Sequence, residues 1–155
     1  MRFLLYDSIT AISKGRSIEG VKTFSLSEEF FRGHFTRTPV IPGVIYVEAM
    51  AQLLGWLITY SHDFRRSAIM SLIENVTVNP GLRPGFQARI HCEIISSTER
   101  DTLGTARMEA NGSPIATLSR IIFSHFGVAD PRSLREQFIY CSGWENLPHL
   151  TSGTL

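Results

Sequence analysis

The chain has 155 residues with 15 basic and 14 acidic side chains, a formal net charge of +1, and 43% hydrophobic residues. This length suits one domain with a real core, and the ordinary balance of apolar and charged residues excludes a disordered chain. The near-zero charge gives no reason to expect nucleic acid or an anionic membrane as a partner.

The first part of the chain predicts a pair of strands. Residues 3–12 and 17–26 have strand-like patterns, and Ser13-Lys14-Gly15 between them is typical of a turn. The apolar run at the N-terminus is too short for a signal peptide, and Asp7 interrupts it.

A long helix is expected after an irregular segment. Residues 28–42 show little periodicity and contain prolines that exclude a regular helix. Residues 44–60 contain no proline and are apolar on nearly every face, so we expect a helix surrounded by protein. This stretch alone is long enough to suggest a membrane span, but Glu48 and Gln52 near its middle favour a buried helix and no membrane span.

Further strands are expected after the helix, at residues 68–78, 87–97, 103–110 and 115–123. Two strands, one long buried helix and several antiparallel strands favour an α+β fold in which a curled antiparallel sheet wraps one central helix. From Gly127 the character changes, and Asp130-Pro131 can begin a short helix through about Tyr140. We therefore expect one domain over residues 1–126 and a C-terminal extension over residues 127–155, with a flexible tail.

The segment FFRGHFTRTPVIPGVIYVEAMAQ, residues 30–52, places one histidine and one glutamate among apolar residues. A carboxyl group at Glu48 is costly to ionise in such surroundings unless it is paired, and a protonated carboxyl can act as a general acid. Gln52 lies one turn later on the same helical face, within reach of Glu48 or of a water bound to it. His34 can act as a base near neutral pH.

The start of the helix offers a third chemical group. Free N–H groups at a helix start can stabilise negative charge on a carbonyl oxygen, and Gly43 has no Cβ to block a ligand. Together these groups suit proton abstraction next to a thioester carbonyl, followed by loss of hydroxide as water. The alternative is structural, because a lone histidine in an apolar loop and a lone core glutamate are often members of hydrogen-bonded networks.

The same segment resembles the 3-hydroxyacyl-[acyl-carrier-protein] dehydratases of the FabZ type, which have the hotdog fold. The family pattern reads approximately FFxGHFPxxPVMPGVLxxEAMAQ, and the separation from His34 to Glu48 matches it without a gap. The resemblance covers about residues 3–125. FLLYDSI is similar to the first strand of the family, residues 74–85 are similar to its DNVxFxxPVxPGD segment, and ARMEANGSPIATLSRI is similar to its closing hairpin.

The resemblance implies a role for each matching residue in converting a 3-hydroxyacyl thioester to a trans-2-enoyl thioester, in fatty acid or specialised lipid biosynthesis. His34 would take the proton next to the carbonyl, Glu48 would protonate the leaving hydroxyl, and the Gly43 amide would polarise the carbonyl. Supporting roles are implied for Phe35, Pro42 and Gln52. Relatives that also isomerise the double bond typically have aspartate at the position of Glu48, so dehydration alone is implied.

The resemblance also implies partners. In the family the histidine and glutamate of one site come from different subunits, so a homodimer is implied, and many relatives assemble further into a trimer of dimers. The acyl chain would run in an apolar tunnel along the subunit interface. The phosphopantetheine arm of an acidic acyl carrier protein would enter past basic residues, for which the candidates are Arg32, Arg37, Arg65 and Arg66.

No cofactor or metal is expected. Elimination beside a thioester needs only an acid, a base and charge stabilisation, and the five histidines show no HxH or HxxxH spacing. Cys92 and Cys141 form no CxxC pattern, so free thiols and a cytoplasmic location are expected.

Four positions depart from the family pattern. Thr36 replaces the proline of GHFP, Ile41 the usual methionine, Gly81 a proline and Phe86 an aspartate. None removes a catalytic group, but together they leave the acyl chain length open and suggest a divergent member. Two alternatives remain. One is a hotdog acyl-thioesterase, which directs water at the carbonyl, and the other is a non-catalytic acyl-thioester-binding subunit.

Overall fold

A single curled sheet and two α-helices make up most of the computed structural model, which describes residues 3–33, 35, 37–79 and 81–143. In the described part, the sheet has six antiparallel strands in the order β1-β2-β4-β5-β6-β3. They are β1 Ser8–Ser13, β2 Ser17–Phe24, β3 Arg66–Val78, β4 Phe86–Ser97, β5 Asp101–Ala110 and β6 Ser113–Gly127. The helices are the 3-10 helix η1 Glu29–Arg32 and the α-helices α1 Gly43–Ser61 and α2 Pro131–Ser142.

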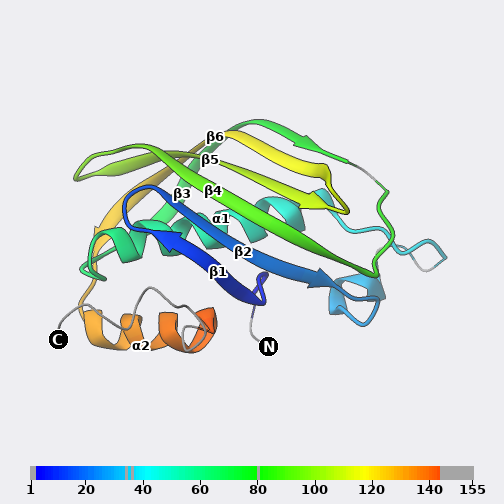
Figure 1. The fold of residues 1–155 in the computed structure, drawn as a ribbon, viewed down its shortest axis with the longest axis horizontal. Coiled ribbons are helices and arrows are strands. Elements are labelled where there is room, and N and C mark those ends of the chain that lie inside the picture. Colours follow the sequence, from blue (N-terminus) through cyan, green and yellow to red (C-terminus); the bar gives the residue numbers. More distant parts are fainter. Residues whose placement is uncertain (1–2, 34, 36, 80, 144–155) are drawn as a thin grey trace.

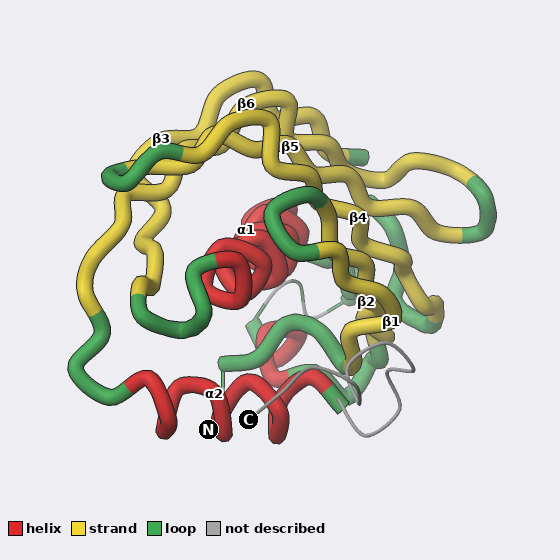
Figure 2. The backbone as a smooth tube through the Cα atoms, turned by 60° about the vertical axis from the view of Figure 1, so that its left-hand side comes forward, coloured by secondary structure: helices red, strands yellow, loops and turns green. Residues whose placement is uncertain are grey.

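The sheet wraps around α1, which lies along its concave side (Figures 1 and 2). α2 lies on the other side of α1, away from the sheet (Figure 2). The pairings of β1 with β2, β3 with β6, β4 with β5 and β5 with β6 each contain a register shift. Such bulges bend strands and increase their twist, which lets the sheet close around the helix. The expected curled sheet around one central helix is therefore confirmed.

The long helix α1 forms the centre of the core, as its composition predicts. Ten of its 19 residues are buried, and Tyr46, Met50, Leu53 and Leu54 have no exposed surface. By length and composition α1 could cross a membrane, but 56% of its apolar 18-residue stretch is buried inside the molecule. Burial against the sheet accounts for its hydrophobicity.

The first strand is shorter than predicted. Residues 3–7 lie outside β1, and a side chain of α1 bonds the backbone of Phe3 and Leu5. The Leu5 N–H donates to Gln52 Oε1 at 2.9 Å, and Gln52 Nε2 donates to the Phe3 carbonyl at 3.2 Å. These bonds replace the ones that a neighbouring strand would supply. The prediction of a strand from Phe3 was wrong over these residues, whereas the other predicted strands agree with the structure to within four residues at either end.

The helix expected from Asp130-Pro131 is confirmed as α2. The Asp130 carboxylate accepts hydrogen bonds from the N–H groups of Arg132 and Ser133, both at 3.1 Å, which caps the helix start. The helix ends before Gly143, which has a φ of 66°. Residues 144–155 lie outside the described part, and the division of the chain at residue 126 stays a prediction.

Aromatic packing attaches α2 to α1. Phe138 on α2 has no exposed surface. Its ring centroid lies 5.2 Å from that of Trp56, 5.5 Å from that of Phe64 and 5.9 Å from that of Tyr60. Phe138 of α2 therefore completes the core beside the central helix.

Two histidines meet at the C-terminal end of α1, and their burial makes stability depend on pH. The ring centroids of His62 and His125 are 4.8 Å apart. Burial lowers the pKa of both imidazoles, and the neighbouring His125 and Arg66 lower the pKa of His62 further. Because both pKa values lie below the unfolded value of about 6.5, the unfolded chain takes up protons first as the pH falls.

We therefore expect the free energy of unfolding to decline as the pH drops from about 7.5 through 6.5 and down to the lowered folded-state pKa values. Urea unfolding at a series of pH values measures this decline. Replacing both histidines with glutamine should flatten it between about pH 7.5 and 5.5, because glutamine binds no proton there. An unchanged slope in the double variant would contradict this assignment.

Candidate active site

Glu48 is half-buried and lies on the face of α1 that carries Gln52. Gln52 Nε2 donates to Glu48 Oε1 at 3.0 Å. The amide of Gln52 is itself oriented by the Leu5 N–H and the Phe3 carbonyl. Since the Leu5 bond requires the Gln52 oxygen to face the N-terminal segment, its nitrogen is directed at Glu48 and at Phe3. The predicted contact between Glu48 and Gln52 is confirmed. The hydrogen bonds by which the N-terminal segment orients Gln52 were not predicted from the sequence.

Glu48 lines a pocket of about 550 Å³ that lies between α1, the start of β3, α2 and the N-terminal segment. The lining of this pocket is largely apolar, and it includes Leu4, Ala51, Trp56 and Met70. A pocket of this size, apolar with a few polar groups, is typical of small-molecule sites. The carboxyl group is therefore placed where it can reach a bound ligand.

His34 lies outside the described residues, as does Thr36. The structure does place their neighbours. Phe35, which is 59% exposed, exchanges two backbone hydrogen bonds with Thr38, at 3.4 and 3.2 Å. In sequence this turn lies between η1 and the N-terminus of α1. None of the described residues 35 and 37–47 lines the pocket that holds Glu48.

The start of α1 has no side-chain cap. Pro42 is the N-cap and supplies no side-chain hydrogen bond to the first N–H groups of the helix. A Cβ on Gly43 would lie 3.1 Å from Val78 Cγ2, which is closer than side chains normally pack. Packing within the chain therefore also favours glycine at position 43, because it lets the helix lie close to the end of β3.

A buried ion-pair cluster holds the segment that precedes residue 34. Lys22 is 6% exposed, and its Nζ lies 2.6 Å from Glu28 Oε1 and 3.5 Å from Asp7 Oδ1. Glu28 is the residue before η1, so this contact fixes the chain just before the GHF sequence. Burying the Lys22 amine without these carboxylates would destabilise the folded chain. The ion pair therefore holds Glu28, and with it the start of η1, next to β2.

Two departures from the family pattern have structural explanations. Gly81 has a φ of 85°, which proline cannot adopt because its ring fixes φ near −65°. The ring centroid of Phe86 lies 5.4 Å from that of Phe24, so this residue adds to the core. Both changes affect the turn after β3 and its surroundings, and neither affects Glu48.

The basic residues separate into two groups. Arg32 and Arg37 lie beside the turn that leads into the N-terminus of α1, whereas Arg65 and Arg66 follow its C-terminus. The Arg66 guanidinium bonds the Glu99 carbonyl, so it is engaged within its own chain. Within a single chain the four arginines therefore form no single surface.

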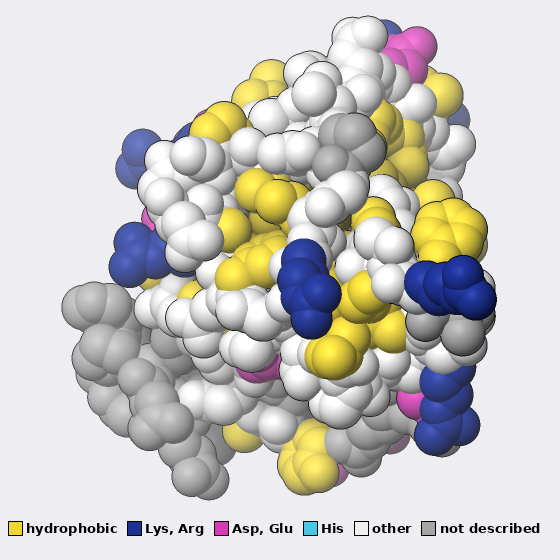
Figure 3. Space-filling model, turned by 90° about the vertical axis from the view of Figure 1, so that its right-hand side faces the viewer, with side chains coloured by type: hydrophobic (Ala, Val, Ile, Leu, Met, Phe, Trp, Pro, Cys, Tyr) yellow, Lys and Arg dark blue, Asp and Glu magenta, His cyan; other side chains and the backbone are white. Residues whose placement is uncertain are grey.

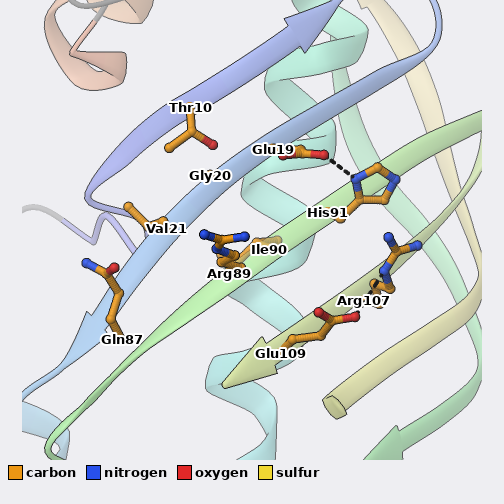
Figure 4. A pocket seen from close by; sticks show the side chains of 10 residues that line it. All are labelled: Thr10, Glu19, Gly20, Val21, Gln87, Arg89, Ile90, His91, Arg107 and Glu109. Atoms are coloured by element: carbon orange, nitrogen blue, oxygen red, sulfur yellow. Dashed lines mark hydrogen bonds and ion pairs between the residues drawn. The ribbon is translucent and has the colours of Figure 1, made fainter. Parts of the chain in front are cut away.

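A second pocket, of about 370 Å³, lies on the outer face of the sheet (Figure 4). Here His91 Nδ1 lies 3.1 Å from Glu19 and Nε2 lies 2.8 Å from Glu93. Both ring nitrogens already face carboxylates, so neither is free to take a proton from a substrate. The hydrogen bond from His91 also lowers the pKa of Glu93, which makes it a poor acid. We therefore place the candidate site at Glu48.

Sequence comparison identifies relatives over most of the chain. The profile of the FabA-like domain matches residues 1–118. The 3-hydroxyacyl-[acyl-carrier-protein] dehydratase FabZ of Bacillus subtilis (strain 168) is 38% identical over 106 residues, which cover 68% of this chain and 74% of that protein.

Comparison with solved structures supports the fold. A putative thioesterase of Lactococcus lactis is 10% identical, with a TM-score of 0.65 over 83% of this chain and all of its own. A hot-dog-like protein of Thermanaerovibrio acidaminovorans is 13% identical, with a TM-score of 0.60 over 83% of this chain and 91% of its own. The predicted hotdog fold is confirmed. At identities this low the similarity establishes the fold alone, and the reaction has to be argued from the residues of the site.

Proposed function

Since this chain belongs to the FabA-like domain family, we propose that it dehydrates 3-hydroxyacyl thioesters of an acyl carrier protein to trans-2-enoyl thioesters, as the name of its Bacillus subtilis relative says of that protein. The observation that carries this proposal is Glu48, held by the oriented amide of Gln52 at the edge of an apolar pocket. A carboxyl group in that place suits proton donation to a leaving hydroxyl.

The reaction needs three groups. His34 takes a proton from C2 of the substrate, and the electron pair moves toward the thioester carbonyl. The uncapped N–H groups at the start of α1, with that of Gly43 first, stabilise the negative charge on the carbonyl oxygen. Glu48 gives a proton to the C3 hydroxyl, the C3–O bond breaks, water leaves and a double bond forms between C2 and C3. Phe35 and Pro42 shape the chain between base and oxyanion donors.

We propose that each site is shared between two subunits. Neither Phe35 nor any of residues 37–47 lines the Glu48 pocket of its own chain. This supports a site in which the histidine base comes from a second subunit. The edge strand β3 supports self-association too, since its exposed side chains include Ile69, Leu72 and Val76 at 63%, 40% and 44% exposure. A long apolar edge strand is a ready surface for pairing with another chain. Further assembly into a trimer of dimers stays a prediction.

The acyl carrier protein would dock at the end of the molecule that holds the start of α1. Lys and Arg side chains surround apolar patches on that face (Figure 3). Within the described part of the chain, Arg37 makes no ion pair, and the only ion pair of Arg32 is a 3.7 Å contact with Glu29. These arginines are therefore available to an acidic partner. We retain Arg32 and Arg37 as docking candidates; Arg65 and Arg66 would contribute only if a partner subunit brought them to the same face.

The product distinguishes dehydration from thioester hydrolysis. Hydrolysis is the alternative because a putative thioesterase has the same fold. Incubation with a 3-hydroxybutyryl carrier-protein thioester should generate the absorbance of a conjugated enoyl thioester with no free thiol. Release of free thiol instead would support a thioesterase. Neither product, with substrate still bound, would support an acyl-binding subunit.

A further inference from the structure

The pocket beside Glu48 continues along α1 to the C-terminal helix. Its lining includes Glu48, Gln52, Trp56 and Thr59, which recur at helical spacing on one face of α1. The lining also includes Leu134 and Gln137 of α2. One continuous space therefore connects the proposed acid to a helix that lies after the region matched by the FabA-like domain.

From this continuity we propose that α2 limits the length of the acyl chain that the site accepts, with Leu134 and Trp56 as specificity-determining residues. The proposal rests on the proposed dehydratase function, because it takes the C3 hydroxyl to lie at Glu48. The acyl tail beyond C3 then runs along α1 toward α2.

The geometry of α1 gives the scale of this limit. Trp56 lies eight residues after Glu48, which is about 12 Å along the helix axis. Carbon–carbon bonds of about 1.5 Å at angles of about 111° advance roughly 1.25 Å each, so this distance holds about nine carbons beyond C3. The pocket therefore accommodates chains of up to about twelve carbons before the tail reaches α2.

Two features of the pocket disfavour an acyl chain that extends beyond α2: α2 is held in place by packing, and polar side chains are part of the lining. Phe138 fixes α2 by packing on Trp56 at 5.2 Å between ring centroids. The polar side chains of Thr59, Ser67 and Gln137 also line the pocket. An alkyl tail that pressed further would separate these polar groups from water without offering hydrogen bonds.

The test is kcat/KM for 3-hydroxyacyl thioesters of four, eight, twelve and sixteen carbons, in wild type and in three variants of α2. In wild type we expect activity through twelve carbons and at least a tenfold fall at sixteen, as steric discrimination in an apolar pocket allows. Leu134→Trp fills the pocket and should lower activity on the twelve-carbon substrate at least tenfold, with the four-carbon substrate unaffected. Leu134→Ala should raise activity on sixteen carbons.

The matched control is Arg135→Trp, on the exposed side of the same helix, which should leave the whole length profile unchanged. Equal wild-type activity on twelve and sixteen carbons would overturn the proposal. So would a Leu134→Trp variant that affects all lengths alike. Absence of wild-type activity on every substrate, the four-carbon one included, would instead contradict the dehydratase function itself.

Discussion

Replacing Glu48 with glutamine is expected to lower kcat/KM for dehydration by about 10²–10⁴-fold, the usual contribution of a general acid. Glutamine has the same shape and lacks the proton that must reach the leaving hydroxyl. Its carbonyl oxygen can still accept the hydrogen bond that Gln52 Nε2 gives to Glu48 at 3.0 Å. The variant should therefore fold normally, which circular dichroism and urea unfolding will check, while steady-state kinetics measure the loss.

The control for this variant is Glu109→Gln. Glu109 lines the pocket on the outer face of the sheet and lies 3.4 Å from Arg107. We expect its activity to stay within about twofold of wild type, because a surface ion pair contributes little. Full activity in Glu48→Gln would remove Glu48 from the mechanism. A large loss of activity in Glu109→Gln would indicate that the catalytic site lies on the outer face of the sheet.

Replacing Phe138 with alanine is expected to lower the free energy of unfolding by about 3–5 kcal/mol, the range for removing a buried aromatic side chain. Phe138 has no exposed surface, and its ring packs against Trp56, Tyr60 and Phe64. Urea unfolding of the purified variant measures the change. The matched control is Arg135→Ala, an exposed position on the same helix, which should change stability by at most about 0.5 kcal/mol.

A small loss in Phe138→Ala, equal to that of the control, would mean that α2 is only loosely attached to the core. That result would also weaken the proposed limit on acyl chain length, because a loosely held helix makes a poor wall. The stability experiment therefore supports or undermines the specificity proposal without any activity assay.

Strong local signals made most of the fold predictable from the sequence. The strands are bounded by turn residues, such as Asn111 and Gly112 with φ values of 52° and 77°. The central helix follows from a long apolar run without proline. Such signals act within a few residues and depend little on distant contacts.

The features that the sequence did not predict depend on contacts between distant residues. Residues 3–7 look like a strand, but the side chain of Gln52 bonds the backbone of Phe3 and Leu5. The helix near the C-terminus was expected, whereas the packing of Phe138 on Trp56 carries no local signal.

The candidate site divides in the same way. The identities and spacing of Glu48 and Gln52 are visible in one motif, which placed Gln52 within reach of Glu48 or of a water bound to it. The pocket was not, because Leu4, Met70 and Leu134 come from three separate parts of the chain. Trp56 could have been found, since it follows Glu48 by two helical turns on the same face. Nothing near Gly43 in sequence pointed to its contact with Val78.

The most direct test of the shared His34–Glu48 site is the activity of mixed dimers. Differently tagged His34→Ala and Glu48→Gln chains would be co-expressed, and dimers that carry both tags would be purified. If base and acid come from different subunits, each mixed dimer contains one intact site and should show about half of wild-type activity, while both parents are inactive. Mixed dimers as inactive as their parents, or chains that never purify together, would contradict the shared site.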